Sequence, residues 1–463
     1  MSRRTFLSQS AGGGFGALAL SHLLQSESAA ALRHHAPKAK RVIQLFMNGG
    51  VSQMDTFDPK PRLTELAGQT FDPGDGQIVE SVTNSPGFNV LASPFAFKRH
   101  GQCGQWVSSV FPHMAGMVDE LTFLNSMTST TNVHGLGSYM QNTGFALPGF
   151  PCLGAWIGYA LGKINDNLPE FVVMTDPKGL PYNNLGNFSA GFLPARHQGT
   201  VIQATSEQPV PYLFPPSEAT HITPDSEMAG LSLLQQLNAH HAKRMPGDSR
   251  LAARMESYEL AARMQLSAPE VFELGKESAN LKQRYGLDQQ HTADFGTRCL
   301  IGRRMLERGV RFVQIWSGAG GPTQNWDNHA NIHTELPYMA KQVDQPIAAL
   351  IADLKARGML NDTLVVWTTE FGRMPFSQGQ SGRDHNGGTF VTWLAGAGLR
   401  PGMSHGESDE WGWKARKPIW CYDLHATILY LLGIDHEQLV YRHNGIDRRL
   451  TDVHGHVINE ILA

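Results

Sequence analysis

The stretch "TLVVWTTEFGR", residues 363–373, joins an apolar run typical of a buried strand to a glutamate, Glu370. Burying an unpaired carboxylate is costly, so a charged side chain directly after such a strand indicates a functional role more than core packing. A short loop of Met, Pro, Ser, Gln and Gly leads on to "GRDHN" (382–386), which adds Asp384 and His385. In open α/β sheets, ligand sites form where the strands end. We therefore expect a site at the carboxyl end of this strand.

Apolar strand-like segments recur along the chain, at residues 40–50, 120–126, 170–176, 311–316 and 389–396. Helical patterns separate several of them, and the longest runs from about residue 334 to residue 357. This alternation predicts an α/β fold with a largely parallel central sheet and helices on both faces. We expect residues 37–463 to form one such domain, with the loop-rich segment 181–290 as an insertion or cap.

The first 36 residues have the features of an export signal. "MSRRTFLSQS" contains the arginine pair Arg3 and Arg4, and a short, glycine-rich apolar stretch and a run of small residues follow it. This pattern is typical of a twin-arginine signal peptide, so we expect a periplasmic or secreted protein. The apolar stretch is too short to remain as a membrane span, and no other segment has about 18 uninterrupted apolar residues.

The composition is that of a globular protein, with 41% hydrophobic and 17% charged residues in a chain of 463. A formal net charge of −3 gives no reason to expect nucleic acid as a partner. The four scattered cysteines form no CxxC pair, so a thiolate metal site is not expected. The 20 histidines stand out, because histidine is the commonest metal ligand and the usual acid or base at neutral pH.

Polar residues also cluster after two other predicted strands. After the first strand, "NGGVSQMDTFDPK" carries Asp55 and Asp58, which could hold a cation or belong to a structural turn. After a later strand, "NWDNHANIH" contains Asp327, His329 and His333. This donor set suits zinc or manganese, although a solvated loop could carry the same residues. Because parallel strands end at one edge of a sheet, we expect these clusters to converge with the one after residue 369.

Several blocks of the chain resemble an exported bacterial family, that of domain of unknown function 1501. They are "FMNGGVSQMDTFDPKP", "LNDTLVVWTTEFGRMP", "GRDHN" and "DLHATILYLLGID", and the resemblance runs from about Lys38 to the C-terminus. That family looks like a remote relative of the alkaline phosphatase and sulfatase superfamily. The resemblance therefore implies an alkaline-phosphatase-like fold with a two-metal site at the carboxyl edge of its parallel sheet.

The resemblance also implies roles for particular residues. A divalent metal (zinc, manganese or calcium) would be held by Asp55, Asp327, His329, Glu370, Asp384 and His385. Catalytic roles would fall to Thr130, which precedes His134 by four positions, and to His134 and Arg373. The chain departs from the superfamily where Glu370-Phe371 replaces an Asp-His pair, and it lacks the sulfatase "C-x-P-S-R" block. Arg373 and Arg383 could form internal ion pairs or an oxyanion clamp.

These features lead to an exported metal-dependent hydrolase of phosphate or sulfate esters, acting on a small-molecule or glycan ester. The alternative is a scaffold that binds sulfated or phosphorylated glycans without turning them over. The missing Asp-His pair and the weak nucleophile, a threonine, favour the alternative. Metal binding is common to both hypotheses, whereas ester hydrolysis distinguishes them.

Overall fold

A computed structural model describes residues 33–463 apart from several short gaps. The gaps are residues 75, 80–88, 207, 211–218, 220–222, 243, 245–253, 256–257, 261–263, 265–269 and 322–323. The predicted export signal thus lies almost entirely outside the described residues. Within the described part, no helix is long and apolar enough to cross a membrane.

The central sheet has the strand order β12-β4-β11-β8-β1-β7-β5-β6, with β13 also paired to β4. Its strands are β1 (Arg41–Met47), β4 (Leu121–Thr128), β5 (Phe171–Met174), β6 (Thr200–Val201), β7 (Phe312–Ser317), β8 (Thr363–Thr368), β11 (Phe390–Gly396), β12 (Met403–His405) and β13 (Ile419–Trp420). Strand β11 runs antiparallel to β4 and β8, whereas the other pairings in this sheet are parallel. The predicted α/β fold with a largely parallel sheet is confirmed.

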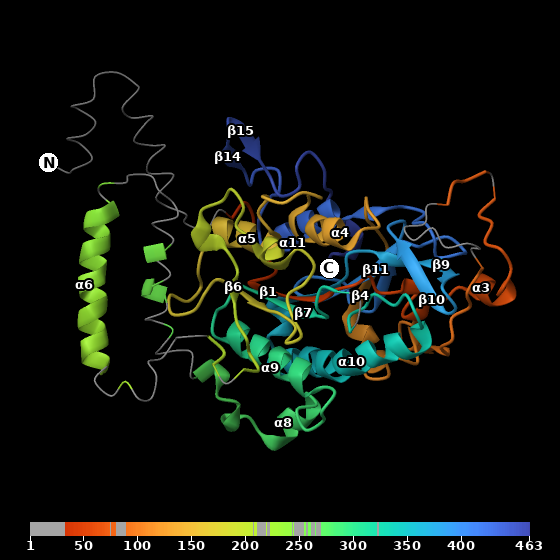
Figure 1. The fold of residues 1–463 in the computed structure, drawn as a ribbon, viewed down its shortest axis with the longest axis horizontal. Helices are drawn as coiled ribbons and strands as arrows, with labels where there is room; N and C mark the ends of the chain where they lie inside the picture. The colour runs from red at the N-terminus through yellow and green to blue at the C-terminus, as the bar shows by residue number, and fades with distance from the viewer. Residues whose placement is uncertain are drawn as a thin grey trace.

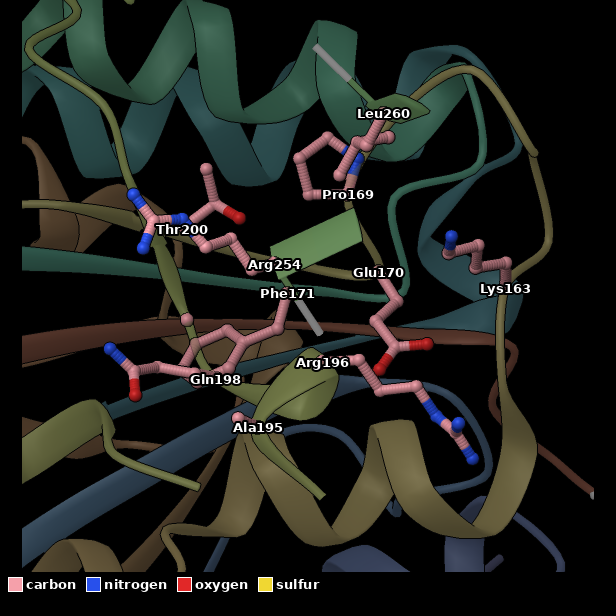
Figure 2. Close-up of a pocket in the computed structure, with 11 residues that line it drawn as sticks. Lys163, Pro169, Glu170, Phe171, Ala195, Arg196, Gln198, Thr200, Arg254 and Leu260 are labelled. Atoms are coloured by element: carbon pink, nitrogen blue, oxygen red, sulfur yellow. The ribbon is translucent and has the colours of Figure 1, made fainter. Parts of the chain in front are cut away.

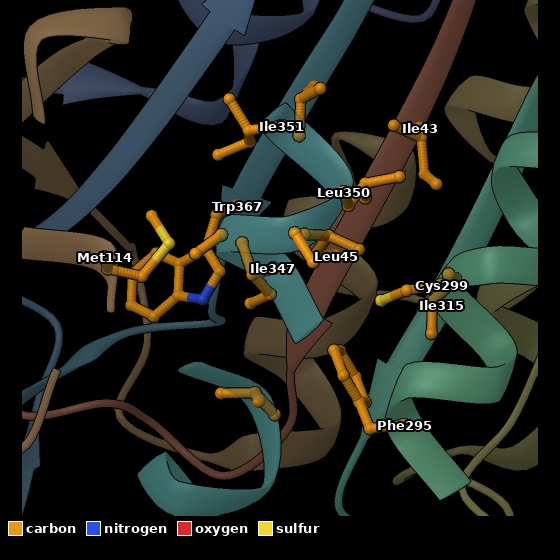
Figure 3. Close-up of a cluster of buried hydrophobic side chains, with 14 of the residues drawn as sticks. Ile43, Leu45, Met114, Phe295, Cys299, Ile315, Ile347, Leu350, Ile351 and Trp367 are labelled. Carbon is orange, nitrogen blue, oxygen red and sulfur yellow. The ribbon is translucent and has the colours of Figure 1, made fainter. Parts of the chain in front are cut away.

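Helices cover both faces of the sheet (Figure 1). On one face lie α9 (Ala293–Glu307) and α10 (Ile332–Ala356), and on the other lie α4 (His134–Thr143), α5 (Leu153–Leu161) and α11 (Cys421–Leu431). The side chains of β1 alternate between these layers, as the two-residue period of a strand requires. Ile43 and Leu45 pack against α9 and α10 (Figure 3), whereas Val42 and Phe46 join the apolar cluster of α5 and α11.

A β-hairpin follows β8 at the carboxyl edge of the sheet. It consists of β9 (Gly372–Gln378) and β10 (Gly382–Asn386), which pair antiparallel with a register shift between Arg383 and His385. The sequence predicted a short loop over residues 374–381, whereas β9 extends through most of that segment to Gln378. "GRDHN" has no apolar alternation, because both faces of β10 are buried among polar partners.

Shorter elements complete the described chain. They are α3 (Pro61–Glu65), the hairpin β2 (Phe97–His100) with β3 (Gln105–Ser108), α6 (Pro224–Ala242), α8 (Ala279–Arg284), and the hairpin β14 (Tyr441–His443) with β15 (Ile446–Arg448). Short 3-10 helices span Gln53–Asp55, Met114–Gly116, Val118–Glu120, Asn184–Phe188, Ala195–His197, Leu274–Lys276, Leu360–Asp362 and Asn459–Ile461. Within segment 181–290, β6 extends the central sheet beside β5.

Candidate metal centre

Four side chains that could bind a metal meet at the carboxyl edge of the sheet. His134, Asp327, His329 and His385 each offer one ligand atom, and these atoms all lie within 4.8 Å of one another. His134 is the first residue of α4, Asp327 and His329 lie between β7 and α10, and His385 is on β10. We call these four residues the His/Asp group. They come from three separate segments that follow β4, β7 and β8.

Asp327 lies at the centre of the His/Asp group. Its Oδ1 atom is 2.6 Å from His329 Nε2, 3.1 Å from His385 Nε2 and 3.2 Å from His134 Nε2. The Nε2 atoms of His329 and His385 are only 2.7 Å apart. Three imidazole nitrogens and one carboxylate oxygen therefore converge on one point, and their side chains are largely buried, His329 the most exposed at 26%.

The far side of each imidazole is held by an oxygen atom. The pairs are His134 Nδ1 with Glu370 Oε1 at 2.7 Å, His385 Nδ1 with the Asn132 carbonyl at 2.7 Å, and His329 Nδ1 with Gln378 Oε1. Because these oxygens accept hydrogen bonds, they favour the tautomer that carries its proton on Nδ1. That tautomer leaves the Nε2 lone pairs directed into the group, as in metal-binding histidines. The residues present thus fit a divalent metal such as zinc or manganese.

The charges around the group favour the metal-binding protonation state of Asp327 and of His385, whereas those around His134 favour its protonated form. Burial alone would raise the pKa of Asp327, but the Arg373 guanidinium and the three imidazoles outweigh it and hold that pKa well below its ordinary value. Burial, together with Arg373 and His134, lowers the pKa of His385 against the opposing hydrogen bond to Asp327. For His134, hydrogen bonds to Asp327 and Glu370 overcome the effect of burial and raise the pKa. Asp327 is thus a carboxylate and His385 a neutral imidazole, the forms in which these residues bind metals.

Arg373 fixes Asp327 from behind. The Arg373 side chain is fully buried, and its Nη2 atom donates a hydrogen bond of 2.6 Å to Asp327 Oδ1. Its other guanidinium atoms donate to backbone carbonyls, including that of Gly50 at 2.7 Å.

The turn after β1 also requires glycine at position 49, where φ is +127° and a Cβ atom would approach the backbone of Trp326 and Asp327 to within 2.5–2.8 Å.

The remaining carboxylates that the sequence singled out lie outside the His/Asp group. Asp55 is fully buried in an ion pair with Arg383, at 2.6 Å from its Nε and 3.2 Å from its Nη2. Glu370 contacts the group only through His134, and it also accepts a hydrogen bond of 2.8 Å from the backbone N–H of Gly49. Asp384 is buried and accepts a hydrogen bond of 2.7 Å from the backbone N–H of His385. Arg373 and Arg383 thus both form internal ion pairs.

Two other candidates are exposed. His333 lies on the surface of α10, where its ring stacks on Phe95 at 6.1 Å, and it is not in the His/Asp group. Thr130 is exposed in the loop before α4 and lines a cavity of about 310 Å³ together with Asn132 and Trp413. Sequence reasoning named His134 as catalytic and missed its place among the possible ligands. The spacing of four residues between Thr130 and His134 does not indicate that His134 could be a metal ligand.

A separate cavity of about 380 Å³ lies at the other end of the sheet (Figure 2). It is lined by Glu170 and Phe171 at the start of β5, and by Lys163 and Arg196. Glu170 is paired with His197, whose Nδ1 atom is 2.6 Å from Glu170 Oε1. Because this cavity is at the amino end of β5, it is remote from the strand ends that position the His/Asp group.

Comparisons with known proteins agree with the sequence motifs. The model of a family described as protein of unknown function (DUF1501) matches residues 39–462. No match was found among curated proteins. Similar solved structures include a sulfatase from Pseudoalteromonas sp., at 12% identity over 91% of this chain and 71% of that chain, with a TM-score of 0.31. A phosphonate monoester hydrolase from Silicibacter pomeroyi is 14% identical over 70% of this chain and 68% of that chain, with a TM-score of 0.32. An alkaline phosphatase from the Antarctic bacterium TAB5 is 10% identical over 86% of this chain and 98% of that chain, with a TM-score of 0.33. Because the family match spans almost the whole described domain, the chain belongs to the DUF1501 family.

Proposed function

We propose that this protein is a metal-dependent hydrolase of phosphate or sulfate esters. The observation that carries the proposal is the convergence of three Nε2 atoms and one carboxylate oxygen within 4.8 Å, with each Nδ1 atom held by an oxygen. The motifs that resemble the alkaline phosphatase and sulfatase superfamily lie on the same strand ends and support this reaction class.

In this proposal the His/Asp group holds the metal, and the residues behind it keep the ligands in position. Glu370 orients His134, and Arg373 orients Asp327. A bound divalent metal supplies a Lewis acid that neutralises the charge developing on the ester oxygens. His329 has the most exposed side chain of the group, so we expect the ester to approach from its side.

Metal analysis and ester hydrolysis on the same purified protein test this function. We expect near-stoichiometric zinc or manganese, hydrolysis of an aryl phosphate or aryl sulfate, loss of hydrolysis with a chelator and recovery when the metal is returned. A protein that binds no metal even after reconstitution would contradict the proposal. A protein that binds metal and cleaves neither ester would favour the alternative below.

The nucleophile is tested in the same assay with two variants. We include Thr130 as the candidate, on the basis of its place before α4 and its exposure. Thr130→Ser retains a hydroxyl and should keep hydrolysis, whereas Thr130→Ala should abolish it. Undiminished hydrolysis by Thr130→Ala would exclude Thr130 from the mechanism.

A non-catalytic binder of sulfated or phosphorylated glycans is the second candidate. One observation favours it: Asp55 is engaged by Arg383 and Glu370 contacts the His/Asp group only through His134, so the described residues offer ligands for one metal and not two. A single metal could bind an anionic ester without completing the superfamily's two-metal mechanism. Binding of a sulfated glycan without turnover of any ester would support this candidate.

We also propose export by the twin-arginine route. Replacing Arg3 and Arg4 together with lysine keeps the charge but removes the paired guanidinium groups that define the signal. The variant is expected to accumulate in the cytoplasm, whereas the wild type reaches the periplasm or the medium. Cell fractionation with immunodetection measures this, and unchanged export of the variant would show the assignment to be wrong.

A further inference from the structure

A cavity of about 330 Å³ adjoins the His/Asp group through Asp327, which is one of its lining residues. One wall is the loop of Asn325, Asp327 and Asn328, and the other wall is the first two turns of α10. Its volume is within the range of about 300–1,000 Å³ that is usual for small-molecule sites. A molecule in this cavity would lie directly beside the group that we propose to bind the metal.

Asn328 lines this cavity and contains a buried oxygen without a hydrogen-bond partner among the described residues. The residue is only 1% exposed, and its Oδ1 atom has no hydrogen-bond partner among the described residues. Its backbone is fixed, because its carbonyl accepts a hydrogen bond of 3.0 Å from the N–H of Arg383. Buried amide oxygens in proteins are nearly always hydrogen-bonded. The amide oxygen of Asn328 is itself closed to solvent, so the polar groups that a ligand in the cavity can reach are those of Gln324, Thr334 and Glu335.

The facing wall combines an aromatic ring with hydrogen-bonding groups. Thr334 and Glu335 precede Tyr338 on α10 by four and three residues, so each of them lies next to Tyr338 on the helix surface. Tyr338 is 52% exposed, although it is a large aromatic side chain. The Lys178 ammonium group lies 3.3 Å from the Tyr338 hydroxyl and 5.2 Å from the ring centroid. The ring can pack against an apolar C–H face while the hydroxyl, carboxylate and amide groups bind hydroxyls around it.

A sugar ring has this combination of chemistry, with C–H faces and a rim of hydroxyl groups. We infer that the cavity between Asn328 and Tyr338 is the subsite for the sugar ring of a monosaccharide ester. This inference rests on the proposed function, since the ester group of such a ligand would lie at Asp327. It adds the part of the substrate that the subsite recognises and the residues that recognise it.

The test measures binding and turnover of glucose and galactose 6-phosphates and 6-sulfates, with methyl phosphate and methyl sulfate as ligands without a ring. The wild-type protein should bind the sugar esters more tightly than the methyl esters. Tyr338→Ala should weaken binding of the sugar esters about 10-fold and leave the methyl esters unchanged. Tyr338→Phe keeps the ring and should behave as wild type, and Tyr258→Ala removes another exposed tyrosine (45%) as the matched control.

The outcomes separate this inference from the proposed hydrolase. Equal affinity for sugar and methyl esters, or equal weakening of both by Tyr338→Ala, overturns the subsite even if esters are hydrolysed. A Tyr338-dependent preference for sugar esters supports the subsite even if no ester is cleaved, in which case only the hydrolase fails. Calorimetric titration gives the affinities, and thermal melting checks that the variants are folded.

Discussion

The His385→Ala variant is expected to bind Zn²⁺ at least about 100-fold more weakly than the wild type. The reason is that His385 Nε2 is one of four converging ligand atoms, and losses in the outer shell alone reduce metal affinity by about 10–100-fold. The domain should still fold, because His385 lies on β10 and its ring contacts are with His134, His329 and Phe371, none of which belongs to the large apolar clusters of the sheet. Competition with a chromophoric chelator measures the affinity, and circular dichroism checks the fold.

Two further variants calibrate this result. His333→Ala removes an exposed histidine of the same loop–helix region that is not in the His/Asp group, so its metal affinity should equal that of the wild type. Glu370→Gln keeps the volume but removes the charge that supports His134, so its loss should stay within about 10–100-fold. If His385→Ala binds metal as tightly as His333→Ala does, the His/Asp group is not a metal centre.

Asp55→Asn is expected to lower the free energy of unfolding by about 3–5 kcal/mol, because it leaves the Arg383 guanidinium buried without a counter-charge. Both side chains of this ion pair are fully buried, so water cannot compensate for the lost carboxylate. Metal content should stay at the wild-type level in the fraction that folds, since Asp55 is outside the His/Asp group. Urea denaturation gives the free energy of unfolding, and elemental analysis gives the metal content.

The matched control is Asp447→Asn. Asp447 pairs with Arg442 at 3.1 Å, and both side chains are more than half exposed, so its removal should cost no more than about 1 kcal/mol. If Asp55→Asn instead loses the metal and keeps its stability, Asp55 is a metal ligand, as the sequence analysis expected.

The strands of the central sheet could be predicted from sequence because their apolar runs are buried on both faces. Strands β1, β7 and β8 are entirely or almost entirely buried, and each is a short, largely apolar run that can be read directly from the sequence. Strand β10 could not be predicted in this way, since "GRDHN" is buried by polar contacts such as that of Arg383 with Asp55. Those partners are 328 residues apart, and no local pattern encodes their pairing.

The sequence predicted which residue types form the site, but only partly which of these residues lie together. Polar residues at strand ends identified Asp327, His329 and His385, and the structure brings these three together. The sequence offered several equivalent carboxylates, and only the tertiary contacts decide between them. Asp55 faces an arginine and Glu370 faces an imidazole, so each has a partner that composition and spacing could not reveal.

The position of β1 in the middle of the sheet has a consequence for biosynthesis. Gln44 of β1 pairs with Gln314 of β7, which is made 270 residues later, and β8 follows later still. At about 5–20 residues per second, a ribosome needs roughly 14–54 s to add that length. During this time the apolar β1 strand has neither of its sheet neighbours, so the centre of the sheet cannot form until β7 and β8 have been made. Chains released before residue 312 would keep that strand unpaired and prone to aggregate, so we expect chaperones to bind this protein during its synthesis.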